Sequence, residues 1–125
     1  MKTTVCLNAL ERAIIEPAGD GIAVTFTGVL TIRRLIHYKD AATLSFLLSD
    51  ALIGRAHPLK VQLAGGESIA CEPIPAGVLM MVKTKALVLP RRLTREAAEV
   101  LAWALDQACE ALETAAERAH AQKQA

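Results

Sequence analysis

Aromatic side chains are scarce in this chain, at 3% of its 125 residues. Proteins that bind single-stranded nucleic acid usually stack bases on several aromatic rings, so this scarcity weighs against a surface of that kind. Cysteine is scarce as well, and the three cysteines include no Cys-x-x-Cys pair. Their odd number and wide spacing argue against a disulfide framework and against a zinc site of the usual spacing.

Long hydrophobic runs are also missing. No apolar run approaches the roughly 18 residues that a membrane-spanning helix needs, so no membrane partner is expected. Glu11 and Arg12 interrupt the region where a secretory signal would carry its apolar segment. Hydrophobic residues nevertheless make up 53% of the chain and charged residues 22%, which favours one cytoplasmic domain spanning residues 1–125.

The net charge is only +1, but the charges are unevenly distributed along the chain. Residues 31–95 carry ten lysines and arginines against four acids, whereas residues 96–125 carry two against six. A basic middle therefore precedes an acidic C-terminal segment. This asymmetry is the electrostatic feature that bears most directly on possible partners.

The pattern of apolar residues predicts an α+β fold. A mainly antiparallel β-sheet of five to seven strands is expected in residues 1–92, packed on one face by a long C-terminal amphipathic helix. That helix is predicted over residues 94–120, capped by Thr94, with alanines and leucines on one side and acids on the other.

A short central helix is predicted over residues 40–53, with Asp40 as its N-cap and Gly54 just after its end. A single strand is expected over residues 78–89, ended by Pro90.

Residues 3–16 match neither a clean helix nor a clean strand pattern. Strand-like segments on both sides of residues 64–67 predict a β-hairpin. No internal repeat is recognised.

No motif indicates an enzyme. Residues 65–68 lack the spacing of a nucleophile elbow, and no glycine-rich phosphate loop occurs. The histidines His37, His57 and His120 are scattered, so neither a metal site nor a cofactor is predicted. No catalytic, cofactor-binding or metal-binding residue is therefore assigned.

Basic residues form three groups in the middle of the chain: one adjacent pair, one pair spaced two apart on a predicted strand face, and one group before the last helix. If the strands are neighbours, these groups make one surface for phosphates; the alternative is an ordinary solvated sheet surface. The predicted nucleic-acid-binding residues are Arg33, Arg34, Lys83, Lys85, Arg91 and Arg92.

Trp103 is the only tryptophan, and it falls on the acidic side of the predicted last helix. An early strand or loop of the same chain is expected to cover it; were it exposed, it would mark a partner surface. The predicted partner-binding residues on that side are Trp103, Asp106, Glu110 and Glu113.

Residues 82–89, followed by Leu93, Thr94 and one long helix, look like the ending of the PC4-like single-stranded DNA-binding fold. The resemblance implies a basic curved sheet that precedes a helix, and a homodimer built by that helix. It covers about the last third of the chain and rests on the order of elements. The helix predicted over residues 40–53 departs from the pattern, and no family residue is carried over as a site.

Three functional hypotheses follow. The favoured one is a non-enzymatic regulatory or accessory protein that self-associates and binds nucleic acid through its basic middle. The second is a protein-interaction module that acts through the acidic last helix, and the third is a small-molecule binder or enzyme with a pocket under the central helix. The alanine–leucine side of the last helix favours a symmetric homodimer.

Overall fold

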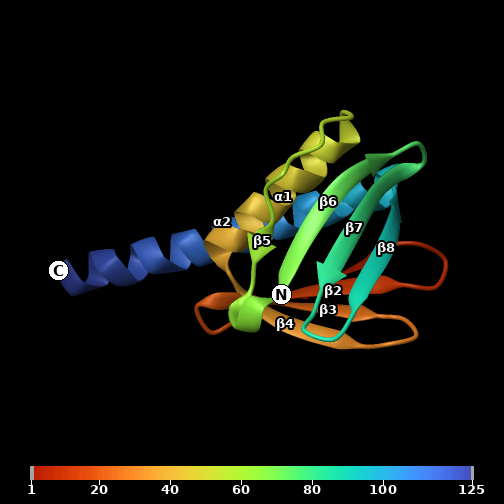
Figure 1. The fold of residues 1–125 in the computed structure, drawn as a ribbon. Helices are drawn as coiled ribbons and strands as arrows, with labels where there is room; N and C mark the ends of the chain where they lie inside the picture. Colours follow the sequence, from red (N-terminus) through yellow and green to blue (C-terminus); the bar gives the residue numbers. More distant parts are fainter. Residues whose placement is uncertain (1, 125) are drawn as a thin grey trace.

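The computed structural model describes residues 2–124, with side chains described as far as residue 122 (Figure 1). Within these residues the chain forms two antiparallel sheets and two helices, which confirms the α+β class. The elements in chain order are β1 (Thr3–Cys6), β2 (Arg12–Ala18), β3 (Gly21–Thr27), β4 (Ile32–His37), α1 (Tyr38–Leu52), β5 (Val61–Gln62), the 3-10 turn η1 (Ala64–Gly66), β6 (Ser68–Ile74), β7 (Gly77–Lys83), β8 (Val88–Thr94) and α2 (Arg95–Gln124).

Each sheet is a four-stranded meander, in the orders β1-β2-β3-β4 and β5-β6-β7-β8. The expected single sheet of five to seven strands is therefore wrong. The ambiguous residues 3–16 contain β1 and most of β2, which ends at Ala18. The strand expected over residues 78–89 is instead a hairpin, because Thr84 N–H donates to the carbonyl of Leu87 at 2.8 Å and turns the chain.

Pro90 lies inside β8 instead of ending a strand. β8 is an edge strand of its sheet, where a residue without an N–H is tolerated. The hairpin predicted around residues 64–67 is confirmed, since β5 and β6 pair on either side of η1.

Both predicted helices form, with small shifts at their ends. Thr94 caps α2, because its Oγ1 accepts from the N–H of Ala97 at 3.1 Å. The N-cap of α1 is His37 and not Asp40, which lies in the first turn. Gly54 follows the C-cap of α1 with φ +82°, a conformation that favours glycine.

The order of four strands followed by one helix occurs twice, so the expectation that the chain has no internal repeat is wrong. We call the first unit (β1 to α1) the N-half and the second (β5 to α2) the C-half. The strand registers match: Ala18 pairs with Gly21 in the N-half as Ile74 pairs with Gly77 in the C-half. The central helix, which departed from the PC4-like pattern, is the helix of the first unit.

Two equivalent glycines show that the two halves share the same close packing between strands as well as the same order of elements. A Cβ at Gly21 would lie 2.9 Å from the carbonyl oxygen of Ile36, one residue before the cap of α1. A Cβ at Gly77 would overlap the carbonyl oxygen of Leu93, one residue before the cap of α2. In both halves the strand passes so close to the edge strand that only glycine fits.

The helices exchange sheets between the halves. α1 packs mainly against β6 and β7 of the C-half, whereas α2 packs against β1 and β2 of the N-half as well as against its own β7 and β8 (Figure 1). The two helices also pack antiparallel against each other, where Ser45 Oγ donates to the carbonyl of Ala102 at 3.1 Å. The two helices thus pair within one chain.

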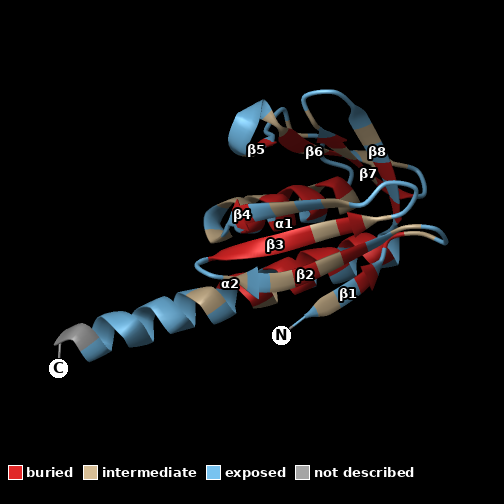
Figure 2. Cartoon of the chain, turned by 90° about the horizontal axis from the view of Figure 1, so that it is seen from below, coloured by how far each residue is buried: buried red, intermediate tan, exposed pale blue. Residues whose placement is uncertain are grey.

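One continuous core joins the two halves (Figure 2). The predicted alanine–leucine side of α2 is buried from Ala97 to Ala108. Its continuation at Ala115 and Ala119 is exposed, since the C-terminal part of α2 projects away from the sheets (Figures 1 and 2). None of the helices within the described residues is long and apolar enough to cross a membrane.

The close approach at Gly77 gives a stability prediction. Gly77→Ala is expected to lower the free energy of unfolding by about 2–3 kcal/mol, because the new Cβ meets rigid backbone. Gly66→Ala is the control: it has a positive φ of +80° but nothing within 4 Å of the new Cβ, so it should cost only about 1 kcal/mol. Urea denaturation followed by Trp103 fluorescence measures both values. Equal losses in the two variants would contradict the steric explanation.

Candidate nucleic-acid interface

An ion pair between the two halves organises the predicted basic surface. Arg34, on the inner face of the edge strand β4, donates from Nε and Nη2 to the carboxylate of Glu67 at 2.5 and 3.0 Å. Its Nη1 also donates to the carbonyl of Arg33 at 2.9 Å, which fixes the guanidinium plane. The bonds to Arg34 lower the pKa of Glu67, and the bonds to Glu67 raise the pKa of Arg34.

One further cation acts on this ion pair, and two more are neighbours of its members. Lys85, in the β7–β8 turn, lies close enough to Glu67 for its charge to lower the pKa of that carboxyl. Lys83, at the end of β7, pairs with Ser68, the residue after Glu67. Arg33 precedes Arg34 on β4 and is exposed.

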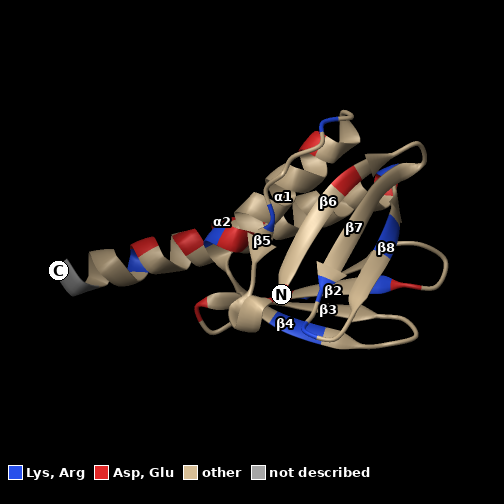
Figure 3. Ribbon diagram, viewed as in Figure 1, with Lys and Arg blue, Asp and Glu red and all other residues tan. Residues whose placement is uncertain are grey.

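We call Arg33, Arg34, Lys83 and Lys85 the basic cluster. One residue from each of two predicted basic groups, Arg34 and Lys85, meets at Glu67, and the bands of positive charge on β4 and at the end of β7 are visible in Figure 3. The strand prediction for Lys85 is wrong, because that residue lies in a turn; it approaches β4 through the fold and not by alternation along a strand.

Arg91 lies apart from the basic cluster. It is 4% exposed, and its Nη1 forms an ion pair with the Glu11 carboxylate. Its Cζ lies 5.8 Å from the centre of the Phe26 ring, and its buried Nε has no partner among the described residues. Burial lowers the pKa of Arg91, but an arginine remains charged at neutral pH. Arg91 is therefore buried in an ion pair with Glu11, and its side chain is not accessible to phosphates.

Arg92 is exposed on the outer face of its sheet, opposite Leu79 on β7. It is four residues from the start of β8, so roughly 13 Å of strand separates it from the end that pairs with Lys83. Arg92 is a separate positive charge and does not extend the basic cluster directly.

The two ion pairs occupy equivalent places in the repeat. Each arginine lies on the inner face of an edge strand three residues before the helix N-cap, and each glutamate directly precedes the second strand of the other half. Glu11 and Glu67 were not predicted as important. The one signal available in the sequence is their position before two strands, each of which carries a Glu-Pro pair, at residues 16–17 and 72–73.

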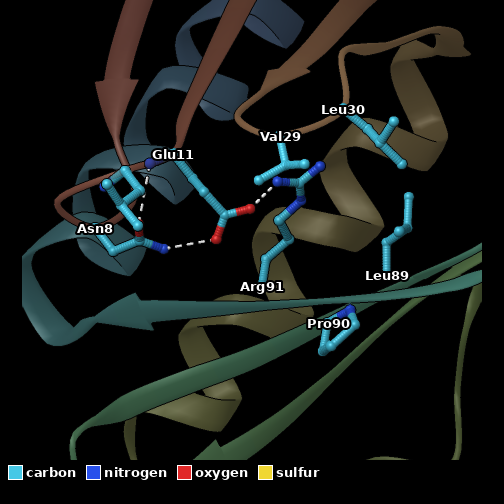
Figure 4. Close-up of a pocket in the computed structure, with 8 residues that line it drawn as sticks. Asn8, Glu11, Val29, Leu30, Leu89, Pro90 and Arg91 are labelled. Atoms are coloured by element: carbon cyan, nitrogen blue, oxygen red, sulfur yellow. Dashed lines mark hydrogen bonds and ion pairs between the residues drawn. The ribbon is translucent and has the colours of Figure 1, made fainter.

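A cavity of about 390 Å³ lies above the Arg91–Glu11 pair (Figure 4). Figure 4 shows the Arg91 side chain pointing between Glu11 on one side and Leu30 on the other. The walls are mostly apolar, and the lining residues are Asn8, Leu10, Glu11, Val29, Leu30, Leu89, Pro90 and Arg91. This place differs from the pocket expected under the central helix, whose inner face is filled by buried leucines.

The predicted partner-binding residues all lie on α2 and are all exposed. Trp103 is 57% exposed, so the expectation that an early strand or loop covers it is wrong. The reason is that α2 turns its opposite side to the sheets and to α1, and nothing in the described chain reaches over Trp103. Asp106, Glu110 and Glu113 continue along this outer side at helical spacing.

The cysteines are unpaired and widely separated. Cys6 is exposed on β1, whereas Cys71 and Cys109 are buried. Burial raises the pKa of Cys71 to about 12 and that of Cys109 to about 11. The two buried thiols therefore stay protonated and behave as small apolar residues.

Comparisons with protein-family models, with curated proteins and with solved structures found no match to this chain.

The Arg34–Glu67 pair gives a pH prediction. Because the folded-state pKa of Glu67 is below the ordinary value of 4.5, the pair stabilises the fold above that pH, and the contribution is lost as pH falls through the folded value. Glu67→Gln should therefore make the unfolding free energy depend less steeply on pH in the acid range. Glu117→Gln, on the exposed projecting part of α2, is the control and should leave the slope unchanged. An identical acid profile for the Glu67 variant and the wild type would exclude the coupling.

Proposed function

We propose that this chain is a cytoplasmic, non-enzymatic regulatory or accessory protein that binds nucleic acid through the basic cluster. The observation that carries the proposal is that Arg34 and Lys85 meet at the carboxylate of Glu67, while Arg33 lies on the outer face of β4 and Lys83 pairs with Ser68 at the end of β7. Four positive charges and one negative charge leave a local excess, and such an excess attracts a phosphate backbone and releases its counterions.

Within the basic cluster, Arg34 is the residue whose charge is paired, with Glu67. Glu67 holds Arg34 in place, whereas Arg33, Lys83 and Lys85 have exposed side chains and no ion pair among the described residues. These three side chains can therefore contact phosphates without breaking an ion pair of the folded chain.

The neighbouring apolar side chains favour an unpaired strand over a duplex. Leu35 on β4 is 59% exposed, and Leu87 and Val88 beside Lys85 are 51% and 54% exposed. Bases that are not paired can rest their faces on such side chains while their phosphates contact the cations. Because the cluster offers no aromatic ring, affinity should come mainly from phosphate contacts and depend little on sequence.

The proposal predicts salt-dependent binding of short single strands. Anisotropy of labelled oligo-dT and oligo-rU should report binding at about 50 mM salt that weakens steeply as salt rises. The double variant Lys83→Glu/Lys85→Glu should bind at least about tenfold more weakly and lower the slope of log K against log salt by about 0.7 per lost contact.

A matched control makes the same change of charge elsewhere. Arg55→Glu/Arg118→Glu alters two exposed arginines, one after α1 and one on the projecting part of α2. It should bind nearly as the wild type does. Absence of binding by the wild type at low salt would overturn the proposal, and so would an equal loss in the control.

A further inference from the structure

α1 and its C-cap residue carry a second, uncharged stripe of mostly apolar residues on the side that faces away from the sheets. Its members are spaced four, three and four residues apart, the spacing of a coiled-coil seam, and none is charged. They are Ala42, Phe46, Ser49 and Ile53. Phe46 is 50% exposed and Ile53 is 66% exposed, although the inner side of α1 already packs on the core.

α2 presents an equivalent stripe next to it. Fifty-seven residues further along the chain, the same four positions are Glu99, Trp103, Asp106 and Glu110. Because α1 and α2 pack antiparallel, the two stripes lie side by side, and a shallow groove between them is lined by Ile53 and Trp103 among others. We call these eight residues the outer helix face.

We propose that the outer helix face binds the outer helix face of a second copy of this chain, forming a two-fold dimer. An uncharged stripe at coiled-coil spacing is complementary to itself, because each α1 can offer the same seam to its partner about a two-fold axis. The contact differs from the one expected from the alanine–leucine side of α2, which is occupied inside the chain as far as Ala108.

The exposed apolar area agrees with an interface of ordinary size. Phe46, Ile53 and Trp103 together leave roughly 300 Å² of side chain exposed, given about 150–250 Å² for a whole aromatic residue. A stable interface buries about 800 Å² per partner, of which slightly more than half is apolar. The three side chains thus supply most of the apolar share, and the rest of the two helices supplies the polar remainder.

The charges on this face favour a second copy over an unrelated apolar partner. The acids Glu99, Asp106 and Glu110 lie along α2, whereas Lys39 and Arg55 lie at the two ends of the α1 stripe. A face that carries both signs around an uncharged seam can pair opposite charges when two copies meet about a two-fold axis. The basic cluster contains no helical residue, so it stays free in the dimer.

Trp103 provides a direct probe, because it is the chain's only tryptophan and lies in the proposed contact. Sedimentation over a range of concentrations should show a monomer–dimer equilibrium. The emission of Trp103 should shift to shorter wavelength over the same range, as water leaves the indole. Phe46→Lys and Ile53→Asp should each weaken the dimer at least tenfold and leave the circular dichroism spectrum unchanged, since both side chains are half-exposed or more in one copy.

Val29→Lys is the matched control, because Val29 is 100% exposed in the β3–β4 loop, away from both helices. It should leave the dimer constant unchanged. A chain that stays monomeric at the highest concentrations would overturn the proposal. A dimer that is insensitive to Phe46→Lys and Ile53→Asp would overturn it as well, because the copies would then meet through another face. Both outcomes are independent of nucleic-acid binding, which is measured separately.

Discussion

Two arginine–glutamate pairs bridge the halves of this molecule at equivalent positions. Arg34 of the N-half meets Glu67 of the C-half, and Arg91 of the C-half meets Glu11 of the N-half. The second pair is largely buried, so removing one partner would leave an uncompensated charge in the interior at a cost of about 3–5 kcal/mol. Together with the exchange of helices between sheets, these contacts join the two halves, and we expect them to fold as one unit.

The residues that flank the two arginine–glutamate pairs differ, so the two similar halves present different surfaces. Around Arg34 and Glu67, the β4 strand and the β7–β8 turn add the cations Arg33 and Lys85. At the corresponding places around Arg91 and Glu11, the chain has Pro90 and Val29, and an apolar cavity forms. The surroundings of the Arg34–Glu67 pair are thus basic, whereas those of the Arg91–Glu11 pair are apolar. Nucleic-acid binding is therefore proposed only for the surface around Arg34 and Glu67.

Local signals in the sequence predicted the helices and one hairpin. Thr94 caps α2, and Gly54 ends α1, because caps and positive φ depend on neighbouring residues alone. The turn at residues 84–87 escaped prediction, since it contains neither glycine nor proline and is closed by backbone and Thr84 hydrogen bonds. The first two strands were missed because β1 has only four residues, and because β2 lacks a clean alternation and contains Pro17.

The site was harder to predict, because it depends on contacts between distant residues. The sequence indicated six basic residues, but only the fold shows that Arg91 is buried against Glu11 and that Lys85 approaches Glu67. The repeat was missed for a similar reason. Matching residues such as Gly21 and Gly77 are few, and the offset between halves grows by one residue between β3 and β4, so no continuous similarity remains.

Native-state hydrogen exchange tests most directly whether the halves form one cooperative unit. Amide protons of β2 and β3 and those of β6 and β7 should exchange with the same opening free energy and the same dependence on denaturant, since each sheet is covered by a helix from the other half. If one sheet opens at a clearly lower free energy while the other stays protected, the halves are independent and the account of the bridging pairs is contradicted.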